Sequence, residues 1–225
     1  MVMAGSIAAV KKELRKKIRD ILKDLPDSAA SSQSALSMGF FRVGAKADLK
    51  ASNATKTLLA MPEYKAAKRI SVYLSMPTGE INTSSIVRDA LADGKKVFIP
   101  YTYSLSNPKE GQPRSIMDML ELQSMNDFDS LEPDKWAIPT PSKDSISSRV
   151  NCFGGTGTTN GEVDSNGANA GLDLIVMPGM AFDANFGRLG HGKGFYDYFL
   201  SRCHQAAHMP FRGKNYCHFC MWRAN

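Results

Sequence analysis

The sequence predicts a three-layer α/β domain, in which helices flank a mostly parallel sheet. The first observation is the order strand, helix, strand over Arg69–Met76, Thr83–Ala92 and Lys96–Tyr101, which is typical of a βαβ unit with parallel strands and a right-handed crossover. The second is the apolar run Leu172–Met177, which is typical of a strand at the centre of a parallel sheet. We therefore expect ligands at the carboxyl ends of these strands.

The other elements follow from residue spacing and from helix signals. Lys11–Leu25 has apolar side chains at helical spacing with charges elsewhere, so it predicts an amphipathic helix packed against another element. In the βαβ unit, Asn82 or Thr83 caps the helix and Asp93-Gly94 stops it. The remaining predictions are helices over Ala54–Ala67 and from Gly194 through Leu200, and a strand over Met117–Leu122.

The composition excludes several classes of protein. Of the 225 residues, 43% are hydrophobic and 22% are charged, which is ordinary for a folded globular protein. The longest nearly apolar run, Leu172–Phe182, contains Asp173 and is shorter than the ~18 residues that a membrane span needs. The four cysteines are too few and too unevenly placed for a secreted disulfide scaffold.

The first residues carry no clear targeting signal. Met1–Val10 lacks the basic residues that precede the apolar core of a secretory signal. Glu13, Asp20 and Asp24 are acids of the kind that mitochondrial presequences avoid. We expect a cytoplasmic location and leave a mitochondrial one open.

The positive charge is concentrated at the two ends of the chain. The formal net charge is +6, from 28 Lys and Arg against 22 Asp and Glu. Residues 1–23 carry a net +5 and residues 201–225 a net +4, which leaves −3 for the residues between them. A nucleic-acid-binding protein usually spreads positive charge over its folded body, so we expect no nucleic-acid partner.

Gly187–Gly194, with the sequence GRLGHGKG, carries the clearest chemistry. It follows a predicted strand and precedes a predicted helix, which is where α/β proteins bind phosphates. The spacing matches a phosphate-binding loop up to Lys193, but Gly194 replaces the Ser/Thr whose hydroxyl would hold magnesium. Arg188 adds positive charge, and Asp197 could hold the metal instead. The alternative is a simple glycine turn.

Four segments carry a family resemblance. They are Phe182–Asp197 after LIVMPG, KKELR at Lys11–Arg15, YLSMPTGEINT at Tyr73–Thr83 with the GKKVFIPY that follows, and WAIPTP at Trp136–Pro141. Together they resemble the 5-formyltetrahydrofolate cyclo-ligases, also called methenyltetrahydrofolate synthetases, from about residue 10 to residue 203. The resemblance implies that ATP phosphorylates the formyl oxygen of 5-formyltetrahydrofolate. The second folate nitrogen then closes the ring, which yields 5,10-methenyltetrahydrofolate, ADP and phosphate.

The resemblance also implies the residues of the site. ATP would contact the first helix and the glycine loop through Lys11, Lys12, Glu13, Leu14, Arg15, Arg188, Leu189, Gly190, His191, Gly192, Lys193, Gly194, Phe195 and Tyr196. Folate would contact Leu74, Glu80 at its polar pterin edge, Trp136, and His191, Gly192, Lys193, Gly194 and Phe195. Lys193 and Arg188 would act in catalysis, and Asp197 would bind magnesium. His191 stands where arginine is common in the family.

Other readings of these residues stay open. The lysines of the first helix could form a solvated face. Leu74 could be an ordinary core residue of its strand, and Trp136 a packing residue with its N–H satisfied. Glu80 beside a glycine is also typical of an acid near a helix N-terminus.

Two segments depart from the family pattern. Residues 35–52 have no counterpart and are interpreted as an insertion. After Met209 the resemblance stops, where the family continues with further strands and a second acidic metal contact, so these strands are expected to be missing or replaced. We hypothesise that both segments are translated intron or gene-model artefacts. The expected organisation is one cyclo-ligase-like domain over 1–209, with a flexible loop over 153–171, and an atypical tail over 210–225.

The sequence leaves three functions in competition. The first is a monomeric cyclo-ligase that uses ATP and magnesium. The second is a pseudo-enzyme that keeps nucleotide or folate binding without turnover, and the third is a basic-tailed nucleic-acid-binding module. A structural zinc site in the tail is a further hypothesis, with the ligands Cys203, His208, Cys217 and Cys220.

Overall fold

The computed structural model describes residues 4–23, 47–77, 80–162, 170–183, 187–206, 216–217 and 221–223. Its centre is a six-stranded mixed sheet in the order β3-β2-β1-β6-β10-β9. The strands are β1 (Arg69–Val72), β2 (Lys96–Ser104), β3 (Ser115–Leu122), β6 (Leu174–Val176), β9 (Tyr216–Cys217) and β10 (Met221–Arg223). β1 pairs in parallel with both β2 and β6. The other neighbours, β3 on β2, β10 on β6 and β9 on β10, are antiparallel.

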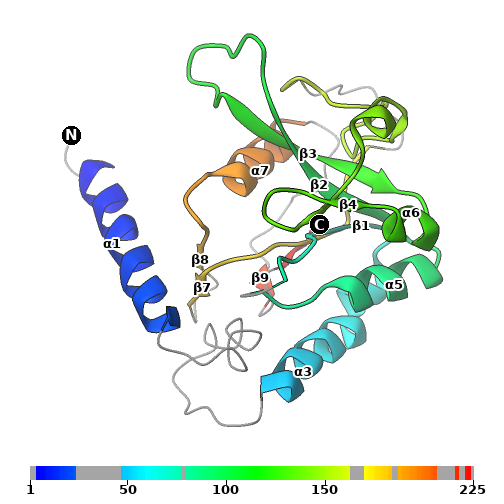
Figure 1. Cartoon of the computed structure of the whole chain (residues 1–225), viewed down its shortest axis with the longest axis horizontal. Helices are drawn as coiled ribbons and strands as arrows, with labels where there is room; N and C mark the ends of the chain where they lie inside the picture. Colours follow the sequence, from blue (N-terminus) through cyan, green and yellow to red (C-terminus); the bar gives the residue numbers. More distant parts are fainter. Residues whose placement is uncertain are drawn as a thin grey trace.

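Helices cover both faces of this sheet, which confirms the α/β prediction. α3 (Ala47–Ala60), α4 (Pro62–Ala66) and α5 (Ser84–Ala92) lie on one side of the strands, and α7 (Phe195–Gln205) lies on the other (Figure 1). α6 (Met125–Asp129) and the 3-10 helix Lys143–Ser148 are short. The hairpin β4 (Glu132–Pro133) and β5 (Pro139–Thr140) forms a separate small sheet.

The alternation of side chains along the strands divides the core into two layers. On one face, Ile70 and Val97 pack in a cluster with Leu58 of α3 and Val87 of α5. On the other face, residues such as Phe98 pack with α7. Because successive side chains of a strand point to opposite faces, each strand supplies both layers.

Several boundaries differ from the sequence expectations. The first helix, α1, spans Ala4–Lys23 and so begins before the predicted Lys11. The helix predicted over Ala54–Ala67 is two helices, because Pro62 has no N–H to donate within a helix and starts a new one. β1 ends at Val72, although the apolar alternation continues to Met76.

The ends of the predicted loop and insertion are structured where they are described. α3 begins at Ala47, so the last residues of the interval 35–52 are helical. Phe153, at the start of the loop predicted over 153–171, is a core residue that is 1% exposed. Thr159 in the same loop bonds to Asp118 of β3, so this half of the loop is fixed to the sheet. Residues 163–169 lie outside the described residues.

The tail adds strands to the sheet. Met221–Arg223 pairs with β6, at the edge where further strands were expected to be missing or replaced. Within the described ranges, no helix is long and apolar enough to cross a membrane.

The described part of the tail gives the zinc hypothesis no support. Cys203 is buried in the apolar cluster around α7, and burial raises the pKa of its thiol, which disfavours the thiolate that zinc binds. His208, Cys220 and the side chain of Cys217 lie outside the described residues.

Candidate active site

The glycine loop lies beyond the carboxyl end of β6, where it connects a small hairpin to α7. The hairpin pairs β7 (Ala181–Phe182) with β8 (Arg188–Leu189). Asp183 closes its tip, because the Asp183 carboxylate accepts a hydrogen bond of 2.7 Å from the Gly187 N–H. This is where the sequence placed a phosphate loop: after a central strand and before a helix.

Two glycines of the loop adopt backbone conformations that favour glycine. Gly194 precedes the first residue of α7 with a φ of +72°. Gly192 has a φ of +96°, and a Cβ atom there would lie 3.4 Å from the guanidinium carbon of Arg15. A side chain at Gly192 would therefore strain the backbone and press on α1.

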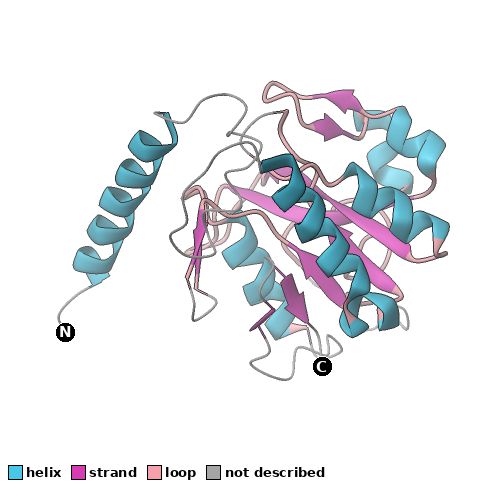
Figure 2. Cartoon of the chain, turned by 90° about the horizontal axis from the view of Figure 1, so that it is seen from below, coloured by secondary structure: helices cyan, strands magenta, loops and turns pink. Residues whose placement is uncertain are grey.

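Arg15 joins α1 to this loop. Its Nε donates a hydrogen bond of 2.8 Å to the Gly190 carbonyl oxygen across 175 positions of sequence. α1 otherwise stands apart from the sheet, on the side of β7 and β8 (Figure 1, Figure 2). The first helix and the glycine loop, both assigned to ATP by the resemblance, are thus neighbours. The other assigned residues of α1 are exposed: Lys11, Lys12, Glu13 and Leu14.

The predicted cation and the predicted metal ligand bind each other. Arg188 donates from one terminal nitrogen to Oδ1 of Asp197 at 2.8 Å, and from the other to the Pro178 carbonyl oxygen at 3.1 Å. The guanidinium also lies 5.5 Å from the centre of the Tyr196 ring. Arg188 is thereby held in place at the start of α7, whereas the Asp197 side chain is 78% exposed.

The donor set of Asp197 fits magnesium only with help from a ligand. No group of three or more potential protein ligands occurs in the described residues. Magnesium commonly binds one or two carboxylates together with substrate phosphates. An exposed Asp197 beside a phosphate loop satisfies that minimal requirement.

Glu80, in the segment between β1 and α5, lies close to the glycine loop. Its Oε2 accepts a hydrogen bond of 2.9 Å from the Met76 N–H, and its Oε1 lies 4.0 Å from Nε2 of His191. The segment is tied down at both ends, because Thr83 donates to the Tyr73 carbonyl oxygen at 2.6 Å. Glu80 therefore lies next to the glycine loop.

Burial shifts the pKa values of this pair in opposite directions. The Glu80 side chain is 12% exposed, and its burial raises its pKa above the ordinary value. Burial, followed by the positive charges of Arg188, Arg19 and Arg15, lowers the pKa of His191. A neutral His191 is therefore the expected form at pH 7.

The remaining predicted residues are less closely joined. Lys193 and Phe195 flank Gly194 in the loop, with Lys193 exposed and Phe195 packed against the core cluster. Leu74 is 7% exposed and packs in the core, as its alternative reading proposed. Trp136 is 55% exposed in the β4–β5 connection, with the Lys135 ammonium 4.1 Å from its ring centre. Among the described residues, Trp136 forms no hydrogen bond, ion pair or ring contact with Glu80 or with the glycine loop.

Sequence reasoning missed three charged residues around the site. Arg19 lies on α1 close enough to influence His191, and helical spacing from Arg15 was the signal that could have indicated it. Asp118 of β3 and Arg202 of α7 form a buried ion pair of 2.7 Å. A charged residue inside an apolar strand, here Asp118 in β3, was the signal for that pair.

The chain matches a known protein family and several of its members. Residues 7–212 match the model of the 5-formyltetrahydrofolate cyclo-ligase family. The 5-formyltetrahydrofolate cyclo-ligase of Mus musculus is 37% identical over 151 residues, which cover 67% of this chain and 62% of the mouse protein. The probable 5-formyltetrahydrofolate cyclo-ligase of Schizosaccharomyces pombe is 30% identical over 158 residues, which cover 69% of this chain and 62% of that protein.

A solved structure supports the fold. The 5,10-methenyltetrahydrofolate synthetase of Aquifex aeolicus superposes with a TM-score of 0.51 at 22% identity, over 86% of this chain and 73% of that chain. This chain spans less than two thirds of the length of the two curated relatives above. The match over residues 7–212 nevertheless confirms the resemblance carried by the four segments: the chain belongs to the 5-formyltetrahydrofolate cyclo-ligase family.

Proposed function

We propose that this chain catalyses the ATP-dependent conversion of 5-formyltetrahydrofolate to 5,10-methenyltetrahydrofolate, with release of ADP and phosphate. The observation that carries the proposal is the meeting of three distant segments. Arg15 of α1 bonds to Gly190 of the glycine loop, and His191 of that loop lies 4.0 Å from Glu80. A nucleotide held by the first two segments would therefore lie beside a folate held by the third.

The glycine loop is suited to neutralise and orient phosphates. Arg188 and Lys193 supply the positive charge that transfer of the γ-phosphoryl group requires, and Arg15 adds a further cation from α1. Catalysis of phosphoryl transfer consists mostly of positioning and charge stabilisation. The Pro178 carbonyl oxygen holds one terminal nitrogen of Arg188, so the guanidinium stays oriented when Asp197 turns to another partner.

Asp197 would hold magnesium together with the phosphates of ATP. The metal would neutralise charge on those phosphates. Asp197 can leave Arg188 for this purpose, because its side chain is 78% exposed. Its departure frees the Arg188 guanidinium to bind a phosphate oxygen.

The folate chemistry requires an activated formyl group. The formyl group is an amide, and its oxygen is a poor leaving group. Phosphorylation of that oxygen supplies a good leaving group, so the second folate nitrogen can attack the same carbon and expel phosphate. Glu80 would orient the pterin by accepting hydrogen bonds from its polar edge, and Trp136 would pack on the folate. Leu74 would line the same side.

We also propose a cytoplasmic monomer without a nucleic-acid partner. The charge distribution supports the absence of a nucleic-acid partner, because the residues between the two basic ends carry a net −3.

An absorbance assay for methenyl-folate, with and without ATP and magnesium, tests the function. Product that depends on ATP is expected. The same assay is run on a variant whose residues after Met209 are replaced by the C-terminal segment of a relative. If only the variant with the replaced C-terminal segment forms product, this chain is the pseudo-enzyme of the alternative hypothesis. Absence of product from both contradicts the enzyme proposal.

A further inference from the structure

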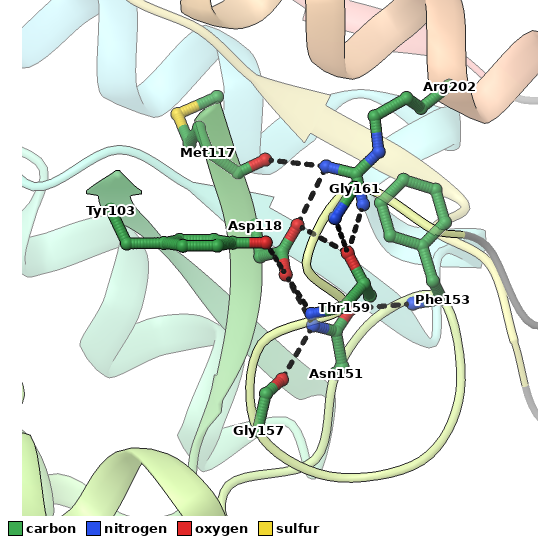
Figure 3. Close-up of polar contacts among 9 residues, drawn as sticks. All are labelled: Tyr103, Met117, Asp118, Asn151, Phe153, Gly157, Thr159, Gly161 and Arg202. Carbon is green, nitrogen blue, oxygen red and sulfur yellow. Dashed lines mark hydrogen bonds and ion pairs between the residues drawn. The ribbon is translucent and has the colours of Figure 1, made fainter. Parts of the chain in front are cut away.

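A buried ion pair joins α7 to strand β3 (Figure 3). Arg202 of α7 donates to Oδ1 of Asp118 at 2.7 Å, and the two side chains are 2% and 0% exposed. Charges removed from water in this way are costly unless their hydrogen bonds are nearly complete. The surroundings of both residues show how that cost is met.

Asp118 accepts hydrogen bonds from three residues besides Arg202. The donors to its carboxylate are the Tyr103 hydroxyl of β2 at 3.0 Å, the Asn151 side-chain amide at 3.0 Å, and the Thr159 N–H at 2.7 Å and hydroxyl at 3.3 Å. Its two oxygens are therefore fully used. The carboxylate ties together β2, β3 and the 151–159 segment.

Several contacts also fix the orientation of the Arg202 side chain. Besides Asp118, it donates to the Met117 carbonyl oxygen at 3.2 Å and to the Thr159 hydroxyl. Its guanidinium also lies 4.5 Å from the centre of the Phe153 ring. Only its Nε has no recorded partner among the described residues of this cluster. The fork of the guanidinium therefore fits one position of α7 relative to β3.

The apolar contacts of α7 with the core do not define that position as sharply. Phe199 and Cys203 pack in an apolar cluster, and apolar packing is not directional. Arg202 lies five residues after Asp197, which is about 7.5 Å along a helix axis. A shift of α7 along its axis would therefore carry Asp197 and the preceding glycine loop by the same amount.

We propose that Asp118 and Arg202 are positioning residues. They fix the position of α7 along its axis on the sheet, and thereby place the glycine loop for the nucleotide. The inference rests on the proposed nucleotide role of the loop. Thr159 is part of the same hydrogen-bond network, because its hydroxyl donates to Asp118 and accepts from Arg202.

The experiment compares this ion pair with a second buried pair in the same chain. Arg149 and Asp127 form an ion pair, with side chains 6% and 15% exposed, that joins α6 to the segment after the 3-10 helix and makes no recorded contact with α7. Arg202→Lys and Arg149→Lys each keep the charge and remove the planar fork. Both substitutions should lower the melting temperature.

Only Arg202→Lys should disturb the nucleotide site. We expect its KM for ATP, and its dissociation constant for ADP, to rise about tenfold, as displacement of a binding loop implies, with a smaller change in kcat. Amide hydrogen exchange over residues 194–199 should also accelerate in Arg202→Lys and not in Arg149→Lys. Thr159→Val, which keeps the side-chain shape, should change ADP affinity and exchange in the same direction.

Equal ADP affinities in Arg202→Lys and Arg149→Lys, with unchanged exchange at residues 194–199, overturn the proposal. If Arg202→Lys does not fold, Thr159→Val decides the question by the same two measurements. If the unsubstituted chain binds neither ATP nor ADP, the proposed function fails. The exchange comparison then still decides whether Arg202 fixes the loop.

Discussion

Burial of Glu80 disfavours its charged form, whereas the folate-binding role that we propose for it uses that charge. Its carboxylate is 12% exposed, and burial raises its pKa. The folded state therefore binds a proton at Glu80 more readily than the unfolded state does. The protein gains stability from Glu80 at low pH and loses it as the pH rises through the folded-state pKa. A charge kept at such a cost is expected to serve ligand binding.

Glu80→Gln should therefore separate stability from binding. Gln can still accept from the Met76 N–H, so the melting temperature at pH 7 should stay equal or rise. Affinity for 5-formyltetrahydrofolate should fall about tenfold or more, the size of a lost charge-assisted hydrogen bond. Calorimetric unfolding and titration check the two effects. A drop of several degrees in melting temperature, with unchanged folate affinity, would show that the role of Glu80 is structural.

His191 should make nucleotide affinity depend on pH. Burial and the charges of Arg188, Arg19 and Arg15 keep its pKa low, while Glu80 faces it from the other side. His191 is therefore neutral at pH 7 and gains its charge only as the pH falls through that lowered value. His191→Arg supplies a cation at every pH.

The measurement is the ratio of ADP dissociation constants between the unsubstituted chain and His191→Arg. The ratio should be largest near pH 8 and shrink as the pH approaches 5, and protonation of ADP itself cancels in the ratio. A ratio independent of pH would remove His191 from the set of groups that influence the nucleotide.

At this scale, the sequence predicts residue types better than pairings. The resemblance predicted that Arg15, Glu80 and the glycine loop share a site, and the structure brings them together. It did not predict that Arg188 binds Asp197, because that contact depends on how the hairpin turns into α7. The contact between Asp118 and Arg202 joins positions 84 residues apart, which no local pattern encodes.

At the scale of elements, α1 is attached to the body through its polar side. Ile7, Val10 and Ile21 are 57%, 60% and 59% exposed, whereas Arg15 bonds to the loop. The amphipathic pattern of the sequence predicted a helix here, but the packing that it implied for the apolar side is wrong for Leu14 and Ile21, which are exposed. It did not indicate which side of the helix meets the body, because that depends on a carbonyl oxygen of a distant loop.

Arg15→Ala should weaken nucleotide binding about tenfold, because it removes both a cation and the bond that holds α1 to Gly190. Lys16→Ala, one residue further along α1, is the matched control, since Lys16 is exposed and exposed charges contribute little. Titration with ADP measures both variants. An equal, small change in the two variants would mean that α1 contributes only general positive charge.

Apolar runs predicted where the strands lie, but they did not predict where each strand ends. Leu172–Met177 and Lys96–Tyr101 predicted β6 and β2 because burial on both faces requires continuous apolar residues. β1 stops at Val72 even though Tyr73 and Leu74 are buried. Burial continues past the end of the hydrogen-bonded ladder, so a hydrophobic pattern alone overestimates the length of the strand.

At the scale of the whole molecule, the core layer under α7 contains two free thiols. Cys152 and Cys203 are buried in the cluster under α7, and burial raises the pKa of each. Because thiolates react and buried thiols do not, both should resist an aromatic disulfide reagent until the domain opens. Their labelling rate in native buffer should be lower by about a thousandfold than in denaturant.

A variant with Cys217→Ser and Cys220→Ser isolates these two thiols for the measurement. Addition of ADP should slow their labelling further, because a ligand of the folded state lowers the open population. Fast labelling without denaturant would show that α7 detaches from the sheet far more easily than its contacts imply.

The bond between Arg15 and Gly190 also sets a delay in biosynthesis. Its two partners are 175 positions apart, so Arg15 leaves the ribosome roughly 10 to 35 seconds before Gly190 at ordinary rates of translation. During that interval α1 lacks the loop to which Arg15 bonds. The contact between α1 and the glycine loop is therefore among the later tertiary contacts to form, after most of the chain has been synthesised.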